Sequence, residues 1–482
     1  MEQINAIAKK SQQVVEVPKK VNARGIKNEI SRISEKVLEH FKDSKAELIT
    51  SAEQLHDYIS RMINVGIGAI DTETTGLDRL KDTIVGASLY YPGGVEVYIP
   101  IKHIVPIFDT LYKEQLTYEQ VAAELQRLVD NGVKLIFANA DFDLAMIFKD
   151  LHVDLLPVCF YDVILAWRCL KENEQDNSLK GLYTKYVLKG AIDRMKFSDF
   201  FTADLFPYCD PQITKLYAAA DAKYTYDLFL WQLPYLQKDN LKCKKHHFEA
   251  ISDLYWGVEV PMIGVCQNMH RTGIYLEQAV ASKLRKKYGD VYTEEQQKAR
   301  DIVKNLLEST EYSTSVKRPF ADSEEFNPNS NPHVEWLVYD YMKLISSKNR
   351  KTNKDTLDQV SHVPIVKQVL KCRSLTTLIG TFVEKLPKLA AESADSRIHC
   401  RFNSIGADTG RMSSADPNMQ NIPSHAGDIR HMFRASPGYV MISSDYSQQE
   451  PKLTAYVSGE SKMINSFKEG RDIYATMAAI AY

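Results

Sequence analysis

The chain has 482 residues, of which 44% are hydrophobic and 25% charged, with a formal net charge of -2. This length allows roughly three domains, and the composition is that of an ordinary globular chain in which each domain can bury a core. No apolar run reaches the about 18 residues that a membrane span needs, and the N-terminus MEQINAIAKK lacks the order of a secretion signal. We therefore expect a cytoplasmic protein with no membrane segment.

The seven cysteines are scattered and form no C-x-x-C pair, so the sequence suggests neither a disulfide framework nor a zinc site. Charge, in contrast, is unevenly distributed. Residues 66–234 include 16 basic and 24 acidic residues, whereas residues 341–434 include 15 basic and 8 acidic residues. A basic region suits a polyanion and clustered carboxylates suit divalent cations, although solvated faces of different charge would look the same.

The predicted elements begin with a helix over about residues 26–41, where apolar residues recur every 3.6 positions, and residues 1–50 show no chemistry. Ser51 and Gln54 predict a capping box for the next helix. Strands are predicted in GIGAID, at 83–90, at 96–100 and in KLIFAN, with a helix from about Thr117 and mostly helical sequence up to Leu233. This order predicts an α/β fold with a mixed sheet.

From about residue 238 the pattern changes to long charged helices, in LRKKYGDVYTEEQQKARDIVKNLL and in VKQVLKCRSLTTLIGTFVEKL. Near the C-terminus the apolar run Tyr439–Ile442 predicts a strand that ends just before Asp445. A carboxylate at a strand end is a candidate metal ligand.

Acidic residues recur at three places in the α/β region. Asp71 and Glu73 lie two apart in DTETTG at a strand end, so they share one face of the sheet. In FANADFDLAMIF, Asp141 and Asp143 mark the junction of a strand and an apolar helix, where Asp141 could simply cap the helix. Each pattern alone is a weak signal.

The third place is LYAAADAKYTYDLF, where Tyr217 and Asp221 are four apart on a helix and therefore share one face. A phenol one turn from a carboxylate can hold a water while the carboxylate binds a metal. The three patterns fall within about one domain's length, and this combination indicates a functional site.

Together these segments resemble the three motifs of DEDD-type 3′–5′ exonucleases, in the subtype whose last motif carries Tyr, over residues 65–235. The resemblance implies that Asp71, Glu73, Asp143 and Asp221 are catalytic, metal-binding carboxylates. It also implies that Tyr217 orients the attacking water and that Asn139 supports the second motif, whereas Asp141 is not on a catalytic position. The expected cofactors are two Mg²⁺ or Mn²⁺ ions, which activate water and stabilise charge on the phosphate.

The segment DTGRMSSADPNMQNIP, residues 408–423, has too many Ser, Asp, Pro and Asn residues for regular structure. It is very similar to the T-G-R-x-S-S-x-x-P-N-x-Q-N-I-P segment of family A DNA polymerases. The resemblance implies that Arg411, Asn418, Gln420 and Asn421 contact DNA, with Arg411 in the minor groove near the primer end. Such groups suit binding without sequence choice, because minor-groove acceptors occur at every base pair.

The stretch SSDYSQQEPKL resembles motif A of the same family, D-Y-S-Q-x-E. By this resemblance Asp445 is a catalytic metal ligand, Tyr446 contributes its backbone to the metal site, and Glu450 and Gln448 bind the incoming nucleotide. Gln449 and Pro451 are departures that we expect to be tolerated.

The resemblance further implies a ribonuclease H-like mixed-sheet exonuclease domain at 51–236, a thumb-like helical region at 237–398 and a partial α+β palm at 399–482, after an N-terminal extension at 1–50. The net positive charge of the thumb region fits duplex binding, although a solvated face is the plainer interpretation of each single cation. The candidate phosphate contacts are Lys343, Lys348, Arg350, Lys351 and Lys354.

Family A polymerases continue after motif A with a fingers helix that grips the triphosphate and an H-D-E motif, and neither occurs in this sequence. We therefore expect an N-terminal portion of a family A polymerase used in replication, with an intact proofreading exonuclease and an incomplete polymerase site. The expected partners are primer–template DNA and single-stranded 3′ ends, dNTP only once the site is completed, and a second polypeptide that supplies the remainder. A viral source, acting in the cytoplasm of a bacterial host, is compatible with this arrangement.

Two alternatives stay open. A stand-alone exonuclease would keep the four carboxylates and lose motif A, which is intact here. A non-catalytic DNA-binding fragment would keep the basic region and would not need Asp71 or Asp221.

Overall fold

The computed structural model of the chain describes residues 23–106, 110–171, 174, 177–190, 196–239, 241–244, 249–309, 317–321, 324–346, 348–407, 409–423, 427–475 and 478. Residues 1–22 of the predicted extension and Asp408 lie outside the described residues. The chain divides into two compact units, Met1–Met432 and Phe433–Tyr482. No helix among the residues described is long and apolar enough to cross a membrane.

The first unit is built around a mixed sheet of six strands in the order β1-β4-β3-β2-β7-β8. Strand β3 is antiparallel to both neighbours, β2 and β4, whereas β2, β7 and β8 run parallel to one another and β1 runs parallel to β4. The strands of this sheet are β1 (Glu47–Leu48), β2 (Ile67–Thr74), β3 (Ile84–Tyr90), β4 (Val97–Pro100), β7 (Lys134–Phe137) and β8 (Cys159–Asp162).

The sheet confirms the predicted mixed α/β arrangement and the strands expected in GIGAID, at 83–90, at 96–100 and in KLIFAN. Strand β8 was not predicted, because its four residues CFYD are too few to show an alternating pattern. It forms because Leu135, Ile136 and Phe137 of β7 pair with it, which is a non-local contact.

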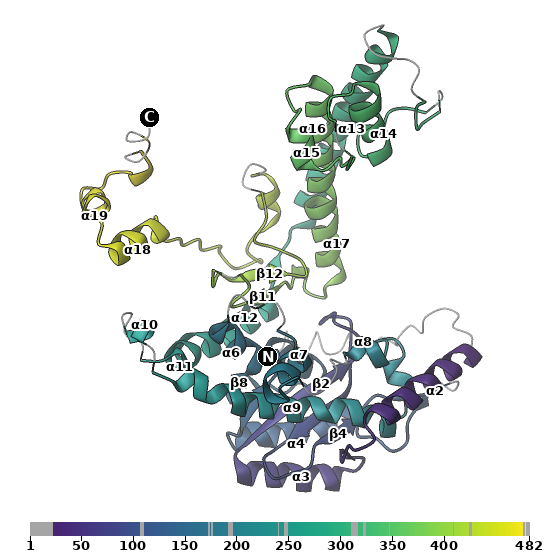
Figure 1. Cartoon of the computed structure of the whole chain (residues 1–482), viewed down its shortest axis with the longest axis vertical. Helices are drawn as coiled ribbons and strands as arrows, with labels where there is room; N and C mark the ends of the chain where they lie inside the picture. The colour runs from purple at the N-terminus through teal and green to yellow at the C-terminus, as the bar shows by residue number, and fades with distance from the viewer. Residues whose placement is uncertain are drawn as a thin grey trace. The chain divides into compact units, whose positions relative to one another are not determined.

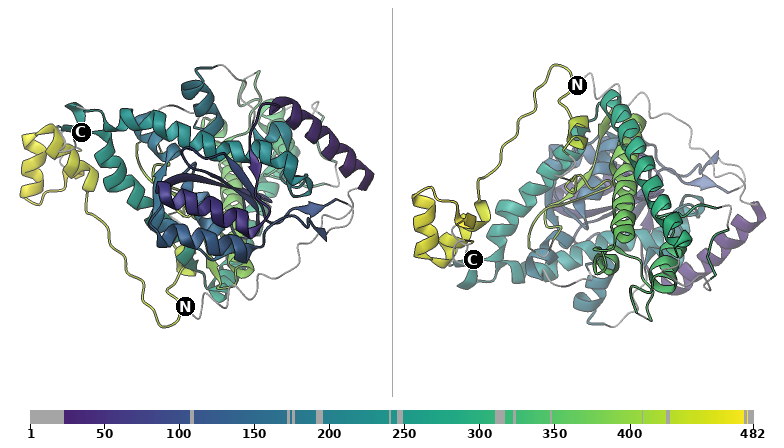
Figure 2. Two further views of the ribbon diagram at one scale, coloured as in Figure 1. Left: turned by 90° about the horizontal axis from the view of Figure 1, so that it is seen from below. Right: turned by 90° about the horizontal axis from the view of Figure 1, so that it is seen from above.

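Helices cover both faces of this sheet (Figure 2). Helix α9 (Pro211–Gln237) runs along one face, and α3 (Ala52–Val65) and α4 (Tyr118–Asp130) lie on the other. The predicted capping box is confirmed: Ser51 Oγ accepts from Gln54 N at 3.2 Å, and Gln54 Oε1 accepts from Ser51 N. The apolar face of α3, formed by Leu55, Tyr58, Ile59 and Met62, is buried.

Further helices complete the region around the sheet. The helix predicted over residues 26–41 is confirmed as α2, and it lies beside α8 and α9 (Figure 1). The remaining helices of this region are α2 (Ala23–His40), α5 (Ala140–Leu151), α6 (Val163–Leu170), α7 (Leu179–Leu182), α8 (Phe197–Phe200), α10 (Leu241–Lys244) and α11 (Ile251–Leu254), and a separate hairpin holds β5 (Ile104–Val105) and β6 (Thr110–Leu111).

The first unit is mainly helical from α10 onward, and the sequence predicted this change from about residue 238. The long helices α13 (Gln278–Glu308) and α16 (Pro364–Leu378) pack together around a core that includes Val303 and Val366. Other elements are α12 (Val260–Thr272), α14 (Asn331–Glu335), α15 (Lys354–Asp358), α17 (Lys385–Glu392), and the strand pairs β9 (Ile274–Tyr275) with β10 (Arg397–Ile398) and β11 (Arg401–Asn403) with β12 (Ser413–Ala415).

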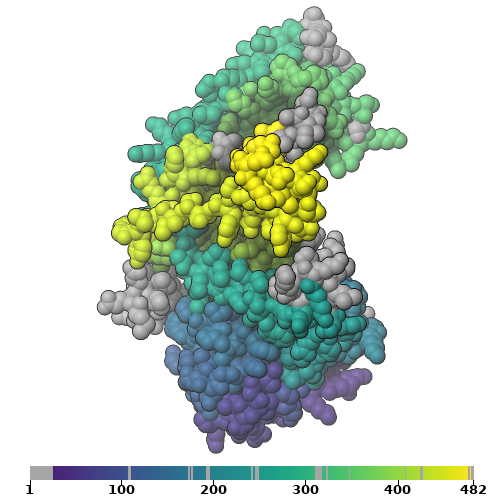
Figure 3. Space-filling view, turned by 90° about the vertical axis from the view of Figure 1, so that its left-hand side faces the viewer, coloured from purple at the N-terminus to yellow at the C-terminus, as the bar shows by residue number. Residues whose placement is uncertain are grey.

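The second unit contains α18 (Gln449–Ser458) and α19 (Ser461–Lys468), drawn in yellow in Figures 1 and 3. The predicted strand at Tyr439–Ile442 is wrong: these residues form no ladder with any part of the chain that the structure describes. Their side chains are 61–85% exposed. A single strand without hydrogen-bonding neighbours gains too little to form, however apolar its sequence.

Candidate active site

Strand β2 carries Asp71 and Glu73 on one face of the sheet, as their spacing predicts. Opposite them on β3 lie Ser88 and Gly86, and the ladder is irregular immediately after Glu73. Glycine is required at this position, because a Cβ on Gly86 would lie 2.1 Å from the hydroxyl of the buried Tyr98.

Helix α9 brings Tyr217 and Asp221 to the same place. Tyr217 is 4% exposed and Asp221 is 9% exposed, and α9 packs along β2 and β3. One carboxylate oxygen from each of Asp71, Glu73 and Asp221 lies within 4.8 Å of the others. Residues 150 positions apart in the chain therefore form one carboxylate cluster.

Asp143 lies beside this cluster on the first turn of α5, where it is 2% exposed. Its Oδ1 accepts hydrogen bonds from Thr72 N at 3.0 Å and from Thr72 Oγ1 at 2.5 Å. Thr72 stands between Asp71 and Glu73 in β2, so these bonds tie the helix that carries Asp143 directly to the strand that carries the other two carboxylates.

The carboxyl groups of the cluster are buried and, for Asp71 and Glu73, lie close to other carboxylates, and these surroundings raise their pKa values. Burial, followed by repulsion from Asp143 and Asp221, raises the pKa of Asp71 well above its ordinary value. Burial and repulsion from Asp221 raise the pKa of Glu73 to about 8. Burial also raises the pKa of Asp143 to about 7, against the hydrogen bonds from Thr72. Without a bound metal ion, the site therefore favours protonated carboxyls at Asp71 and Glu73.

Lys180 of α7 is a further residue of the site, which sequence reasoning did not identify. Its Nζ lies 3.0 Å from Asp221 Oδ2 and 3.3 Å from the centroid of the Tyr217 ring. Burial raises the pKa of Asp221, and this ammonium group opposes that rise. A lysine 41 positions before its partner gives no local signal in the sequence, because most lysines are solvated.

The residues present fit divalent cations. All four donors are carboxylate oxygens, the ligands that Mg²⁺ and Mn²⁺ prefer. Asp221 Oδ1 is buried and has no hydrogen-bond partner within the described part of the chain. A buried carboxylate oxygen without a donor is costly, and a cation would remove that cost.

The two polar residues before Asp143 have other roles. Asn139, with a φ of 74°, precedes α5, and its backbone N–H donates to Asp162 Oδ1 at 3.2 Å. The suggestion that Asp141 caps the helix is wrong, because the first turn is capped by Asp162, which also accepts from Ala140 N at 2.8 Å. Asp141 instead forms an ion pair of 2.6 Å with the buried Arg79.

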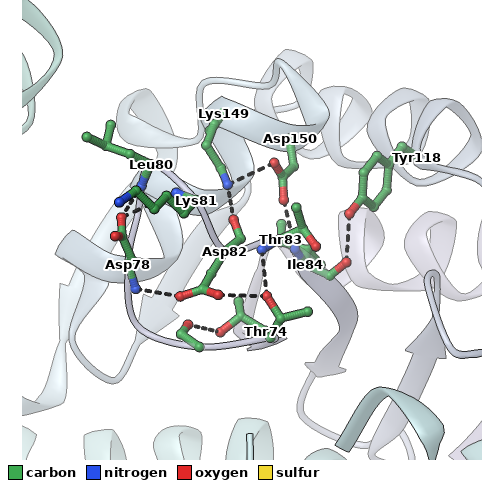
Figure 4. A network of polar contacts seen from close by, with 12 residues as sticks. Thr74, Asp78, Leu80, Lys81, Asp82, Thr83, Ile84, Tyr118, Lys149 and Asp150 are labelled. Atoms are coloured by element: carbon green, nitrogen blue, oxygen red, sulfur yellow. Dashed lines mark hydrogen bonds and ion pairs between the residues drawn. The ribbon is translucent and has the colours of Figure 1, made fainter. Parts of the chain in front are cut away.

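The loop between β2 and β3 is held by a network around Asp82 (Figure 4). The Asp82 carboxylate accepts from Thr75 Oγ1 at 2.9 Å and from the backbone N–H of Asp78 at 2.7 Å. The loop presents Leu77 and Leu80 to solvent, 84% and 53% exposed. Exposed apolar side chains therefore stand a few residues from the carboxylate cluster on an ordered loop.

The predicted DNA-binding residues lie in and after the β11–β12 hairpin. Arg411, Gln420 and Asn421 are exposed. Asn418 Oδ1 accepts from the backbone N–H groups of Gln420 and Asn421, at 3.0 and 3.2 Å, so this side chain shapes the turn. The expectation that the segment lacks regular structure is wrong at Ser413–Ala415, which pairs with β11.

The predicted phosphate contacts of the thumb region differ in their surroundings. The Arg350 guanidinium is bound in two ion pairs, with Glu335 at 2.8 Å and with Asp340 at 2.5 Å. These carboxylates compete with any phosphate for Arg350. Arg350 is therefore a weaker candidate for a phosphate contact than a lysine without such ion pairs would be. The other four, Lys343, Lys348, Lys351 and Lys354, lie in or beside the connection that leads into α15.

The predicted nucleotidyl-transfer residues all belong to the second unit. Asp445 and Tyr446 lie in the exposed extended segment rather than at the end of a strand, so the expected strand-end geometry is wrong here. Gln448, with a φ of 53°, precedes α18, and Glu450 lies exposed on its first turn. Among the residues described, the only acidic cluster suited to a metal is the one at Asp71, Glu73 and Asp221.

Two family models match the chain. The model described as 3′-5′ exonuclease matches residues 46–232, and the model described as DNA polymerase family A matches residues 292–482. The carboxylate cluster thus falls within the first match and Asp445 within the second.

The chain is also similar to proteins that are named DNA polymerase I. The chain is 26% identical over 459 residues to DNA polymerase I of Chloroflexus aurantiacus, covering 90% of this chain and 43% of that protein. It is 33% identical over 242 residues to the thermostable DNA polymerase I of Thermus caldophilus, covering 48% of this chain and 26% of the relative. The chain therefore spans less than half the length of these relatives.

Among solved structures, the POL domain of Pol1 from M. smegmatis, determined in complex with DNA primer-template and dNTP, is similar with a TM-score of 0.59. The two are 19% identical, and the match covers 88% of this chain and 65% of the other. At this identity the similarity shows a shared fold.

Proposed function

We propose that this chain is a member of DNA polymerase family A and that its residues 51–236 form a metal-dependent 3′–5′ exonuclease that removes nucleotides from single-stranded 3′ ends. The observation that carries the proposal is the cluster of Asp71, Glu73 and Asp221, whose oxygens lie within 4.8 Å of one another. The six-stranded mixed sheet supports the ribonuclease H-like interpretation of this domain.

The roles of the side chains follow from their positions. Asp71, Glu73, Asp143 and Asp221 would hold two divalent ions, Mg²⁺ or Mn²⁺, which supply activation of water and neutralisation of phosphate charge. Tyr217, one helical turn from Asp221, is placed to orient the attacking water through its hydroxyl.

The chain's own cation and its loop would bind the substrate. The Lys180 ammonium, between Asp221 and Tyr217, is placed to attract the phosphate next to the terminal nucleotide. Leu77, 84% exposed on the loop after β2, offers an apolar contact to the terminal base. Neither contact selects a particular base, as removal of any mismatched nucleotide requires.

We propose that the region from residue 237 onward binds primer–template DNA, with a thumb-like part at 237–398 and a partial palm at 399–482. The match of residues 292–482 to the polymerase family model supports this, and so do the exposed Arg411, Gln420 and Asn421. Asp445 of motif A would be the metal ligand of nucleotidyl transfer, with Glu450 at the nucleotide.

We further propose that these 482 residues do not extend a primer by themselves. The single cluster of carboxylates in the described residues is far from motif A in sequence, and the exposed Tyr439–Ile442 segment gains order only when another chain segment pairs with it. A second polypeptide could supply that pairing together with the triphosphate-binding residues.

Degradation of a 3′-labelled single strand with Mg²⁺ or Mn²⁺ tests the exonuclease assignment. Wild type should shorten the strand, and Asp71→Ala should lose at least about 1,000-fold in rate, which corresponds to about 4 kcal/mol of transition-state stabilisation. Asp57→Asn, at an exposed position of α3, is the matched control and should behave like wild type. Equal activity of wild type and Asp71→Ala would refute the assignment.

Primer extension with the same preparation tests the polymerase proposal. Extension of a primed template by the purified chain alone would show that the site is complete without another polypeptide. A chain that binds DNA but shows neither activity would favour the alternative of a non-catalytic DNA-binding fragment.

A further inference from the structure

Tyr217 is enclosed by the edges of four aromatic rings. The ring centroids of Phe41, Phe197, Phe200 and Phe201 lie 6.2, 5.9, 5.8 and 5.3 Å from that of Tyr217, at interplanar angles of 63–89°. Such edge-to-face pairs are favourable beyond the burial of the rings, because the positive edge of one ring meets the negative face of the other. Because Tyr217 is only 4% exposed, these neighbours set the orientation of its ring.

The four rings come from two separate segments. Phe197, Phe200 and Phe201 belong to α8 and its end, whereas Phe41 follows the last turn of α2. The enclosure is therefore complete only when the N-terminal helix is docked.

Helix α2 is joined to this region by several contacts. Ile33 and Val37, at 4% and 0% exposure, belong to the same apolar core as Tyr217. Lys36 Nζ donates to the backbone carbonyl of Asp199, and the ring of His40 lies 5.4 Å from that of Phe200. The helix thus packs against both α8 and α9 (Figure 1).

This helix lies outside the part of the chain that matches the exonuclease family model, which begins at residue 46. None of the residues assigned to metal or DNA binding lies in it. Phe41, directly after the end of α2, lies edge-on to Tyr217, a tyrosine one helical turn from Asp221 of the carboxylate cluster.

We propose that α2 is a positioning element of the exonuclease site, which orients Tyr217 relative to Asp221 through Phe41 and α8. The inference rests on the proposed exonuclease function. Phe41 is a positioning residue: it acts through the ring of Tyr217, so its loss changes where the Tyr217 hydroxyl lies and leaves the carboxylates in place.

The full 482-residue chain with Phe41→Ala tests the proposal, and Leu38→Ala, at a position of α2 that is 50% exposed, is the matched control. Phe41→Ala should lower kcat about 10-fold, with KM and Mn²⁺ affinity unchanged, because the Tyr217 hydroxyl then no longer lies where it orients the attacking water. Phe41→Tyr keeps the ring and should restore kcat. An unchanged kcat in Phe41→Ala would overturn the proposal. A fall in Mn²⁺ affinity as large as the fall in kcat would also overturn it, because the carboxylates would then have moved.

Combination with Tyr217→Phe separates positioning from general damage. If Phe41 acts through the Tyr217 hydroxyl, Phe41→Ala should cost nothing further once that hydroxyl is absent. The same 10-fold loss in both backgrounds would show that Phe41 acts elsewhere.

A readout without activity keeps this inference distinct from the proposed function. With fluorotyrosine placed at position 217, the ¹⁹F resonance should shift and broaden in Phe41→Ala and stay unchanged in Leu38→Ala. If wild type fails to degrade DNA, the exonuclease assignment falls, while the ¹⁹F spectrum still decides whether α2 orders this ring. An unchanged spectrum would overturn the positioning role even in an active enzyme.

Discussion

Lys180 provides a sharp test of the site, because it competes with any cation for the same carboxylate. Its Nζ lies 3.0 Å from Asp221 Oδ2, and the two side chains are 15% and 12% exposed. Lys180→Met keeps the length and apolar stem of the side chain and removes its charge. Breaking a buried pair by removing one partner costs about 3 kcal/mol, so in EDTA the variant should unfold at a lower urea concentration than wild type.

Metal binding should change in the opposite direction. An ion that binds Asp221 Oδ1 in wild type is repelled by the Lys180 ammonium at Oδ2 of the same carboxylate, and this repulsion weakens its binding by about 1.5 kcal/mol. Lys180→Met should therefore bind Mn²⁺ about 10-fold more tightly, and saturating Mn²⁺ should remove most of its stability defect. Hydrolysis should nevertheless be slower, by about 100-fold in kcat, because a cation close to the phosphate is lost.

Electron paramagnetic resonance titration of Mn²⁺ gives the affinity, urea unfolding with and without Mn²⁺ gives the stability, and a 3′-labelled strand gives the rate. Lys223→Met is the matched control, because Lys223 also pairs with an aspartate of α9, Asp227, outside the cluster. Weaker or unchanged Mn²⁺ binding by Lys180→Met would refute the view that Lys180 and a metal ion share Asp221.

Three further changes probe other parts of the structure. Thr72→Val removes a hydrogen bond to Asp143 and so raises the pKa of that carboxyl further above 7; Mn²⁺ affinity measured by calorimetry should fall about 10-fold, most strongly at low pH. Gly86→Ala places a methyl group 2.1 Å from the Tyr98 hydroxyl and should lower the free energy of unfolding by about 3 kcal/mol in a thermal melt. Gln368, Lys298 and Lys371 lower the pKa of Glu295 to about 2, from an ordinary 4.5. The stability that Glu295 contributes is therefore complete above pH 4.5 and is lost as the pH falls through about 2, so the urea midpoints of Glu295→Gln and wild type should differ at pH 7, approach each other below pH 4.5 and converge only near pH 2.

Matched controls accompany these variants. Thr74→Val alters a threonine of the same strand whose hydroxyl bonds to the Gly76 carbonyl, and it should leave Mn²⁺ affinity unchanged. Gly289→Ala, in α13 with open space around it, should stabilise by about 0.5–1 kcal/mol. Glu294→Gln, at a side chain 67% exposed, should show no such pH dependence. A Thr72→Val protein with wild-type affinity, a Gly86→Ala protein with an unchanged melt, or a pH-independent gap for Glu295→Gln would each contradict the contact concerned.

Local pattern was sufficient wherever a site depends on neighbours within one element. The period of a strand placed Asp71 and Glu73 on one face, and the helical period did the same for Tyr217 and Asp221. The capping box at Ser51 is equally local, and it is present as predicted. These features need no knowledge of the rest of the molecule, because their geometry follows from the backbone of a single element.

Tertiary structure alone decided which distant groups meet. The bond from Thr72 to Asp143 joins residues 71 apart, and the bond from Lys180 to Asp221 joins residues 41 apart. No spacing rule covers such pairs, since they depend on how α5, α7 and α9 pack against the sheet. The run Tyr439–Ile442 has the composition of a strand but forms none, because a strand forms only where another backbone pairs with it through hydrogen bonds.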